Sequence, residues 1–233
     1  DGVYQNDNEV PFCYINGRKR PLGVGSLFYR AGDRIILDYD GNGRIGTSLP
    51  LEEDRVYCGS PLPIAQGGIV STLNWKGFDL NLLFNYVIGR HILNAGKGAS
   101  LGTYMSAFEK ELTKPVFADL SKVSFWQKPG DRADYPANRL EDGLMNFSTY
   151  LSSNIEKVSY LKLKTLTLGY TLPVKWKEKL GFGARIFISA ENLFTITNYS
   201  GPDPESVDII TGVDNLTNYP LATRVTFGLT LKL

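Results

Sequence analysis

The last twelve residues of the chain alternate between apolar and polar side chains. Val225, Phe227, Leu229 and Leu231 are apolar, and the residues between them are polar or small. Side chains on a β-strand point alternately to opposite faces, so residues 222–233 are predicted to form a strand with one apolar and one polar face. Such a strand leaves unpaired backbone groups along its edge unless another strand pairs with it.

The same alternation predicts further strands upstream. Residues 78–88 place an apolar side chain at every even position, and about eleven residues are enough to cross a bilayer at a tilt. A very short connection at Trp75–Gly77 joins them to residues 69–75 in a predicted hairpin, and an aromatic residue at such a joint is typical of an interfacial girdle. Other strands are predicted at residues 156–172 and 184–194, and a short strand is predicted within residues 22–30.

Within residues 156–172 the alternation changes phase. The apolar positions before Lys164 have one phase, and those after Thr165 have the other. A one-residue slip turns every following side chain to the opposite face, so the change predicts a β-bulge or a change in the buried face. Pro173 ends this strand, and Lys175–Lys179 is predicted to be a solvated basic turn.

The connections between the predicted strands differ in length. Those near residues 76 and 173–183 are short, whereas those after residues 30, 88 and 194 are long. Antiparallel strands place alternate connections at opposite ends, so all long loops are expected at one end. Outer-membrane barrels show this asymmetry, with long extracellular loops and short periplasmic turns, whereas a soluble sandwich has less reason to sort its loops.

The predicted fold class is therefore all-β, an antiparallel transmembrane β-barrel segment with long extracellular loops. About six strands are expected, fewer than the roughly eight that a closed membrane barrel needs, and an open edge is not viable in lipid. The chain is thus interpreted as part of a larger barrel. Its first residue, Asp1, is not Met, which favours a processed chain or a piece of a longer one.

Composition agrees with this interpretation and excludes other classes. The chain has 233 residues and a formal net charge of +1, which argues against a nucleic-acid-binding surface. The 13 Tyr, 12 Phe, 24 Gly and 12 Pro suit strands and turns better than helices. No run of about 18 apolar residues is present, so no spanning helix is expected. Mean hydropathy is −0.15, which does not exclude a barrel whose strands alternate.

Residues 38–45 contain the sharpest local motif. Asp38, Asp40 and Asn42 occupy the first, third and fifth places of a calcium-type loop, and Gly43 stands where the sharp turn requires glycine. Hard oxygen atoms at alternate positions allow a tight loop to wrap around one cation, with Ca²⁺ as the expected ion.

The twelfth place of this loop should carry a bidentate acid, but Leu49 stands there. Asp54 is the nearest substitute, with Glu52 and Glu53 beside it. The candidate metal ligands are Asp38, Asp40, Asn42 and Asp54. The alternative is a plain turn with a solvated acidic cluster.

No catalytic site is expected. Gly98–Gly102 formally matches a hydrolase nucleophile elbow, but the single histidine, His91, precedes Ser100 instead of following it. Residues 104–112 are expected to form a short helix within this long loop. The two cysteines, Cys13 and Cys58, are interpreted either as unrelated thiols or as one loop disulfide, because pairing cannot be derived from sequence.

Several sequence blocks, taken in order, resemble the C-terminal part of SusC/RagA-type TonB-dependent outer-membrane transporters. The resemblance extends over about residues 22–233. The blocks are Gly32–Asp33, Asp38–Gly43, Asp54–Arg55, Gly59–Pro61, Trp75–Leu80, Tyr160–Lys164, Leu168–Pro173, Glu191–Thr195, Gly201–Glu205, Tyr219–Pro220 and Thr226–Leu229. In the family an Asp-Arg pair usually stands near the twelfth place of the metal-type loop, whereas here an insertion moves the pair to Asp54–Arg55.

The resemblance implies that residues 1–233 are the C-terminal portion of a barrel of about 22 strands, a size whose lumen needs a plug. The plug domain and the segment that contacts TonB would lie upstream of this chain. A SusD-like surface lipoprotein would cap the extracellular face, and the cargo would be oligosaccharides or peptides. The expected location is the outer membrane of a Gram-negative bacterium.

A second class of function remains open at this point. An extracellular calcium-binding β-module that binds glycans would also use the acidic loop, and loop aromatics such as Trp126 and Tyr199 suit stacking on sugars as well as ordinary packing. The two classes differ in what the apolar faces of the strands contact, which is lipid in a transporter and a protein core in a soluble module. In a transporter, Leu80 and Leu82 face lipid while Asp79 and Asn81 face a wet lumen.

Overall fold

The chain folds into two compact units, one made of Asp1–Cys58 with Asn94–Asn154 and the other of Gly59–Leu93 with Ile155–Leu233. The structure, a computed structural model, describes residues 2–46, 54–97, 124–137, 139, 145–215 and 218–232. Among these residues no helix is long and apolar enough to span a membrane. Each unit has its own small hydrophobic core and is described separately below.

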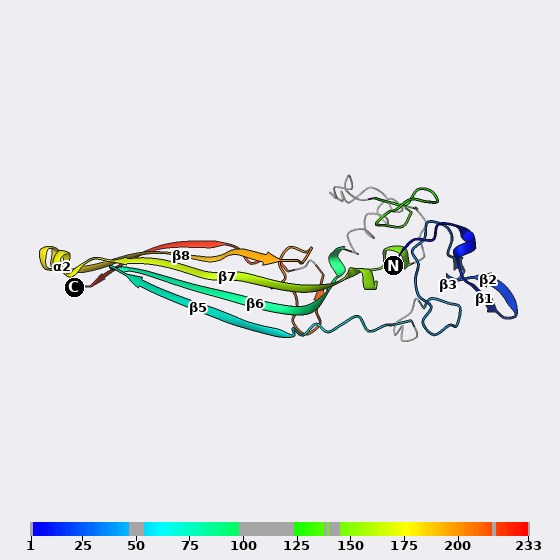
Figure 1. Cartoon of the computed structure of the whole chain (residues 1–233), viewed down its shortest axis with the longest axis horizontal. Helices are drawn as coiled ribbons and strands as arrows, with labels where there is room; N and C mark the ends of the chain where they lie inside the picture. The colour runs from blue at the N-terminus through cyan, green and yellow to red at the C-terminus, as the bar shows by residue number, and fades with distance from the viewer. Residues whose placement is uncertain are drawn as a thin grey trace. The chain divides into compact units, whose positions relative to one another are not determined.

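An antiparallel sheet forms the second unit (Figure 1). Its long strands are β5 (Ala65–Trp75), β6 (Phe78–Asn94), β7 (Ile155–Thr171), β8 (Gly183–Thr197) and β10 (Arg224–Lys232). They lie in the order β10-β8-β7-β6-β5, and the short β9 (Val213–Asp214) pairs with β6. The long strands predicted between residue 69 and the C-terminus are therefore confirmed.

Short connections lie at one end of this sheet. Lys76 and Gly77, with φ of 48° and 91°, join β5 to β6, as a two-residue hairpin turn with two positive φ angles requires. The helix α2 (Val174–Leu180) joins β7 to β8, so the prediction of a plain turn at Lys175–Lys179 is wrong. Pro173 immediately precedes the helix, and its carbonyl accepts the Trp176 N–H at 2.9 Å. The fixed φ of proline suits the start of a helix.

Register separates the apolar and polar side chains onto opposite faces of the sheet. Phe78, Leu80 and Leu82 pair with Tyr170, Leu168 and Leu166, whereas Asp79 and Asn81 pair with Gly169 and Thr167. The apolar face continues onto the outer strands through Ile69, Leu73, Trp75, Ile186, Ile188, Val225, Phe227, Leu229 and Leu231. Most of these side chains are exposed, so this face has no covering layer among the described residues.

The bulge predicted near Lys164 is present. Leu83 pairs with Thr165 and Phe84 with Leu163, which leaves Lys164 as the extra residue in β7. In β8 the register shifts at the same level, where Asn192 adopts a φ of 52°. The extra residue resets the alternation and keeps Leu161 and Leu163 on the same face as Leu166, Leu168 and Tyr170.

The first unit begins with two small hairpins. The first pairs β1 (Phe12–Ile15) with β2 (Arg18–Pro21), and the second pairs β3 (Gly23–Val24) with β4 (Leu27–Phe28). The short strand predicted within residues 22–30 is present as two shorter strands, because Gly25, with a φ of 59°, allows the chain to reverse between them. The core consists of Tyr4, Val10, Leu22, Val24, Tyr29 and Ile45.

Asp33 links distant segments of the first unit. Its carboxylate is 1% exposed, accepts the Arg30 N–H at 2.8 Å and pairs with the Arg139 guanidinium. It also accepts Asn146 Nδ2 at 3.0 Å. A buried carboxylate is stable only when it is paired and hydrogen-bonded, so these contacts hold the segments together. The remaining elements here are the 3₁₀ turns η1 (Asp7–Glu9), η3 (Met145–Phe147) and η4 (Ser152–Asn154).

Candidate functional site

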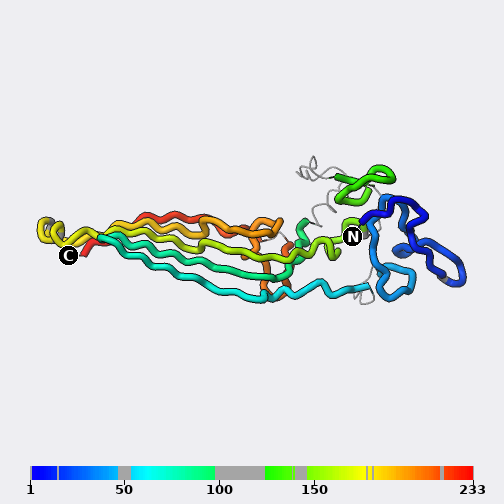
Figure 2. Tube along the Cα trace, in the orientation of Figure 1, coloured from blue at the N-terminus to red at the C-terminus, as the bar shows by residue number. Residues whose placement is uncertain are grey.

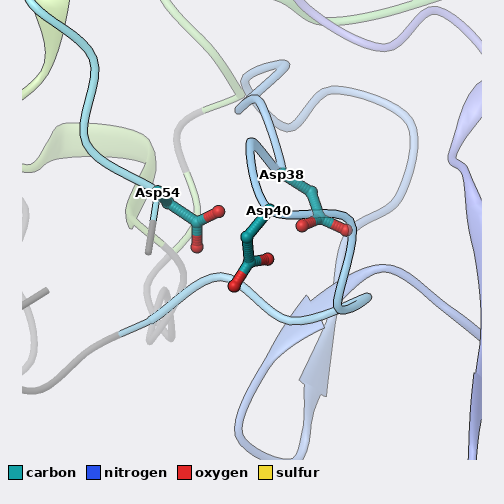
Figure 3. Close-up of side chains that lie close together, drawn as sticks. All are labelled: Asp38, Asp40 and Asp54. Atoms are coloured by element: carbon teal, nitrogen blue, oxygen red, sulfur yellow. The ribbon is translucent and has the colours of Figure 1, made fainter. Parts of the chain in front are cut away.

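Three of the predicted metal ligands come together in the first unit (Figure 3). One carboxylate oxygen from each of Asp38, Asp40 and Asp54 lies within 4.8 Å of the other two. Asp38 and Asp54 are half-buried and Asp40 is exposed. Oxygen ligands of this kind suit Ca²⁺ and Mg²⁺, which prefer carboxylates and carbonyls.

The loop that carries Asp38 and Asp40 has the local geometry of a calcium-type turn. Gly43, at its sixth place, adopts a φ of 79° and donates its N–H to Asp38 Oδ2 at 2.8 Å. Ile45 is 4% exposed in the core of the unit and donates its N–H to the Gly23 carbonyl at 3.0 Å. The turn is thus fixed at both its glycine and its apolar anchor.

Asp54 reaches back to this loop across the intervening residues. Its two carboxylate oxygens accept the Tyr39 N–H at 2.9 Å and the Gly46 N–H at 3.1 Å. Asp54 thereby reaches the place where a bidentate acid is expected in such a loop. Leu49, Glu52 and Glu53 lie outside the described residues.

Asn42, the fourth predicted ligand, is engaged within the loop. Its Oδ1 accepts the Arg44 N–H at 2.7 Å, and its Nδ2 donates to Asp40 Oδ2 at 2.6 Å. The structure therefore brings together three carboxylates, while the oxygen of Asn42 makes a turn contact.

One oxygen of the cluster fits a bound cation. Asp38 Oδ1 is shut off from solvent and has no hydrogen-bond partner among the described residues. A buried carboxylate oxygen without a partner is costly, and two further carboxylates nearby add like-charge repulsion. A divalent cation would relieve both effects, so the residues present fit such an ion.

Among the described residues, His91, Cys13 and Cys58 form no second candidate site. His91 lies near the end of β6, where its N–H donates to the Ser60 carbonyl at 2.9 Å. Ser100 and the helix predicted at residues 104–112 lie outside the described residues. Cys13 and Cys58 are both free thiols.

Sequence reasoning missed a buried ionic cluster in the second unit. Lys162 of β7 is 2% exposed, and its Nζ lies 2.9 Å from Asp203 Oδ2 and 2.9 Å from Glu205 Oε2. Lys164 adds a further ion pair with Glu205 at 2.9 Å. The sequence does show two lysines, Lys162 and Lys164, near the middle of a predicted strand, and two acidic residues within Gly201–Glu205. Their separation along the chain gives no indication that the lysines and the acids are in contact.

The segment between β8 and β10 folds back across the sheet as a result (Figure 2). Lys162 is in register with Asn85, so the segment lies on the polar face. Tyr199 and Val207 pack with Ile92 and Val158 in a small core. Tyr199 donates to Asp214 Oδ2 at 2.5 Å, and burial together with this contact raises the pKa of Tyr199, which keeps the hydroxyl a donor.

Comparison with known proteins identifies the class to which this sheet is similar. No protein-family model matches the chain. It is 32% identical to TonB-dependent receptor P3 of Formosa agariphila, over 88% of this chain and 18% of that protein. It is also 26% identical to TonB-dependent receptor SusC of Bacteroides thetaiotaomicron, over 86% of this chain and 18% of that protein.

Solved structures give the same answer. The RagAB peptide importer in its closed-closed state matches with a TM-score of 0.56 and 26% identity, over 80% of this chain and 19% of the matched chain. The predicted fold class is confirmed, because these structural neighbours are TonB-dependent β-barrel transporters. The described strands form an open sheet that corresponds to part of the wall of such a barrel.

The chain resembles SusC/RagA-type TonB-dependent transporters over most of its length, as the ordered sequence blocks predicted. It spans about a fifth of the length of the curated relatives it matches. Those relatives are named receptors, and the similar solved structures are titled a peptide importer or transporter, which is consistent with the expectation that the chain is not an enzyme.

Proposed function

We propose that residues 1–233 are the C-terminal portion of the barrel of a SusC-type TonB-dependent importer in the bacterial outer membrane. The observation that carries this proposal is the separation of apolar and polar side chains onto opposite faces of the long strands. The apolar face would contact lipid, and the polar face would line the lumen. The plug domain and the TonB-contacting segment would lie outside these residues.

The proposed cargo is an oligosaccharide or a peptide, delivered together with a SusD-like surface lipoprotein. The peptide class has support among the similar proteins, since one is titled a peptide importer, whereas the oligosaccharide class rests on the resemblance of the sequence blocks. The segment after β8, folded onto the polar face, would narrow the lumen beside β6 and β7.

Transport by the whole protein tests this function. Cells that carry the full-length gene are expected to accumulate a fluorescent oligosaccharide or a fluorescent peptide, and to lose this uptake when the transporter gene or the TonB gene is deleted. Loss of uptake after deletion of an adjacent SusD-like gene would identify the lipoprotein that caps the transporter. Uptake of both cargo classes that survives deletion of the transporter gene contradicts the proposal.

The acidic cluster is proposed to bind Ca²⁺ through Asp38, Asp40 and Asp54, with Asn42 turning its oxygen toward the ion. The support is the buried, unpartnered oxygen of Asp38 beside two further carboxylates. In this position the ion would fasten Asp54 to the preceding loop. A separate extracellular calcium- and glycan-binding module accounts for this cluster but not for the exposed apolar face of the sheet, so the transporter is the better reading.

Calorimetric titration of the chain in detergent is the test of the metal. Wild-type chain is expected to bind Ca²⁺, and Asp38→Asn is expected to weaken binding by at least about tenfold, because affinity in such loops follows the number of charged ligands. Glu178→Gln, an exposed residue of α2, is the matched control. Equal binding by wild type and Asp38→Asn would show that the cluster is a solvated turn.

A further inference from the structure

An open cavity of about 450 Å³ lies on the surface of the first unit, is lined by residues of that unit only, and has exposed arginines in its lining. Three of its lining residues are arginines, and none is acidic. The lining residues are Asn16, Arg18, Arg20, Gly25, Phe28 and Arg44.

Two of the arginines come from one strand. In the β1–β2 hairpin, Arg18 pairs with Ile15 and Arg20 pairs with Cys13. Alternate residues of a strand share a face, so both guanidinium groups leave the hairpin on the same side. Lys19, between them, points to the other side and lies over the Phe12 ring at 4.4 Å.

The third arginine comes from the acidic loop. A Cβ added at Gly43 would lie 2.2 Å from the Cβ of Cys13, so the loop packs directly on the hairpin face that carries Arg20. Glycine at this position allows the close approach, and the next residue is Arg44. Three chain segments therefore converge on the cavity, because Gly25 and Phe28 come from the β3–β4 hairpin.

The arginines of this cavity lack an acidic partner in the part of the chain that the structure describes. No ion pair among the described residues engages Arg18, Arg20 or Arg44. Elsewhere in the same unit, Arg139 pairs with Asp33. Since the chain as a whole has 25 basic and 24 acidic residues, three unpaired arginines around one cavity make a local positive field.

The shape of the guanidinium group indicates the ligand. Its planar fork matches the oxygens of a carboxylate, phosphate or sulfate, and such charge-assisted hydrogen bonds are stronger than neutral ones. The Arg20 guanidinium lies 5.8 Å from the centroid of the half-buried Phe28 ring, a cation–π arrangement that restrains it. The ring also offers an apolar surface beside the charges, and the cavity volume falls in the range of small-ligand sites.

We propose that this cavity binds the oxyanion group of a small extracellular solute, with Arg18, Arg20 and Arg44 as its donors. The site is additional to the transport function and to the cation cluster. An acidic peptide and an anionic sugar share the required chemistry.

The test is a titration of the whole chain in detergent with two matched pairs of probes, at saturating Ca²⁺ and again with chelator. One pair is the Glu-Glu and Gln-Gln dipeptides, and the other is glucose 6-phosphate and glucose. At least one anionic probe is expected to bind saturably while its neutral counterpart does not, with affinity falling as salt rises. The pair that shows this difference identifies the solute class.

Variants decide which residues hold the anion. Arg18→Ser with Arg20→Ser is expected to weaken anion binding by at least about tenfold, since two charge-assisted contacts are lost. Arg44→Lys keeps the charge but removes the planar guanidinium group, and a smaller loss of anion affinity is expected. Arg30→Ser removes the same charge from an arginine that is equally exposed but lies outside the cavity lining, and it should leave binding unchanged.

Three results would overturn the proposal. They are the absence of saturable binding by any anionic probe, equal binding of a neutral counterpart, and unchanged binding in the double variant. The lysine variant guards against misfolding as an explanation, because it preserves charge and nearly preserves size. If the chain does not bind calcium, the titration with chelator present still measures anion binding, so the two proposals can fail separately.

Discussion

Replacing Lys162 with methionine is expected to detach the segment between β8 and β10 from the sheet, at a cost of about 3–5 kcal/mol to that contact. Lys162 is buried and neutralises Asp203 and Glu205, each at 2.9 Å. Without the lysine, two carboxylates lie near each other without their main counter-charge. The segment can avoid this cost by moving into solvent, while the long strands keep their backbone pairing.

Hydrogen exchange of residues 198–215 in the full-length transporter measures this release. Exchange there is expected to rise strongly in Lys162→Met, while exchange in β6 and β7 changes little. Lys157→Met, an exposed position on the same strand, is the control. A triple variant, Lys162→Met with Asp203→Asn and Glu205→Gln, should recover much of the protection, because it removes the buried charges together. Unchanged exchange in Lys162→Met would contradict this role.

Acid should weaken the same contact in a defined pH range. Burial alone would raise the pKa of Asp203, but the contact with Lys162 and the Glu205 and Leu221 N–H groups together lower it. A depressed folded-state pKa contributes stability above the unfolded pKa of about 3.9, and this contribution is lost as pH falls through the lower folded value. Protection of the segment, taken as its exchange relative to the intrinsic rate at each pH, should therefore be constant from neutral pH to about pH 4 and fall below it.

The long strands follow from local pattern alone. Strict alternation in residues 78–88 and at the C-terminus predicts two-faced strands, and β6 and β10 have those faces. The phase change at Lys164 predicts the bulge, since one extra residue is the simplest way to keep the leucines on either side of it on one face. These features depend on neighbours in sequence, which is why the sequence predicts them.

The errors have equally local causes. The lysines at 175–179 suggested a solvated turn, but Pro173 and good helix formers favour α2. Gly25 divides the short strand predicted within residues 22–30 into two. The prediction used the patterns of charged and apolar residues and gave too little weight to the backbone preferences of Pro173 and Gly25.

Contacts between residues that are far apart in the chain could not be predicted from the sequence. Lys162 and Asp203 are 41 positions apart, and Asp33 and Arg139 are 106 apart. In the candidate metal site, the spacing of Asp38 and Asp40 was sufficient to suggest both, whereas Asp54 depends on the chain folding back to Tyr39 and Gly46. The arginine cavity needs three segments to converge and has no sequence signature.

The second large effect expected is a contrast between two adjacent residues of β6. Leu82 pairs with Leu166 on the apolar face, and Asn81 pairs with Thr167 on the polar face. If the sheet is part of a barrel wall in a membrane, these neighbours face different solvents. Alternation in a transmembrane barrel has this meaning, with lipid on one side and the lumen on the other.

Spin labels at Leu82→Cys and at Asn81→Cys measure the difference directly, in the full-length transporter reconstituted in lipid bilayers. Cys13→Ser and Cys58→Ser first remove the two free thiols. The label at position 82 is expected to collide with oxygen, which concentrates in lipid, and to be protected from a water-soluble nickel chelate. The label at position 81 is expected to show the opposite preference. High nickel accessibility and low oxygen accessibility at position 82 would contradict the assignment of the apolar face to lipid, and with it the transporter account.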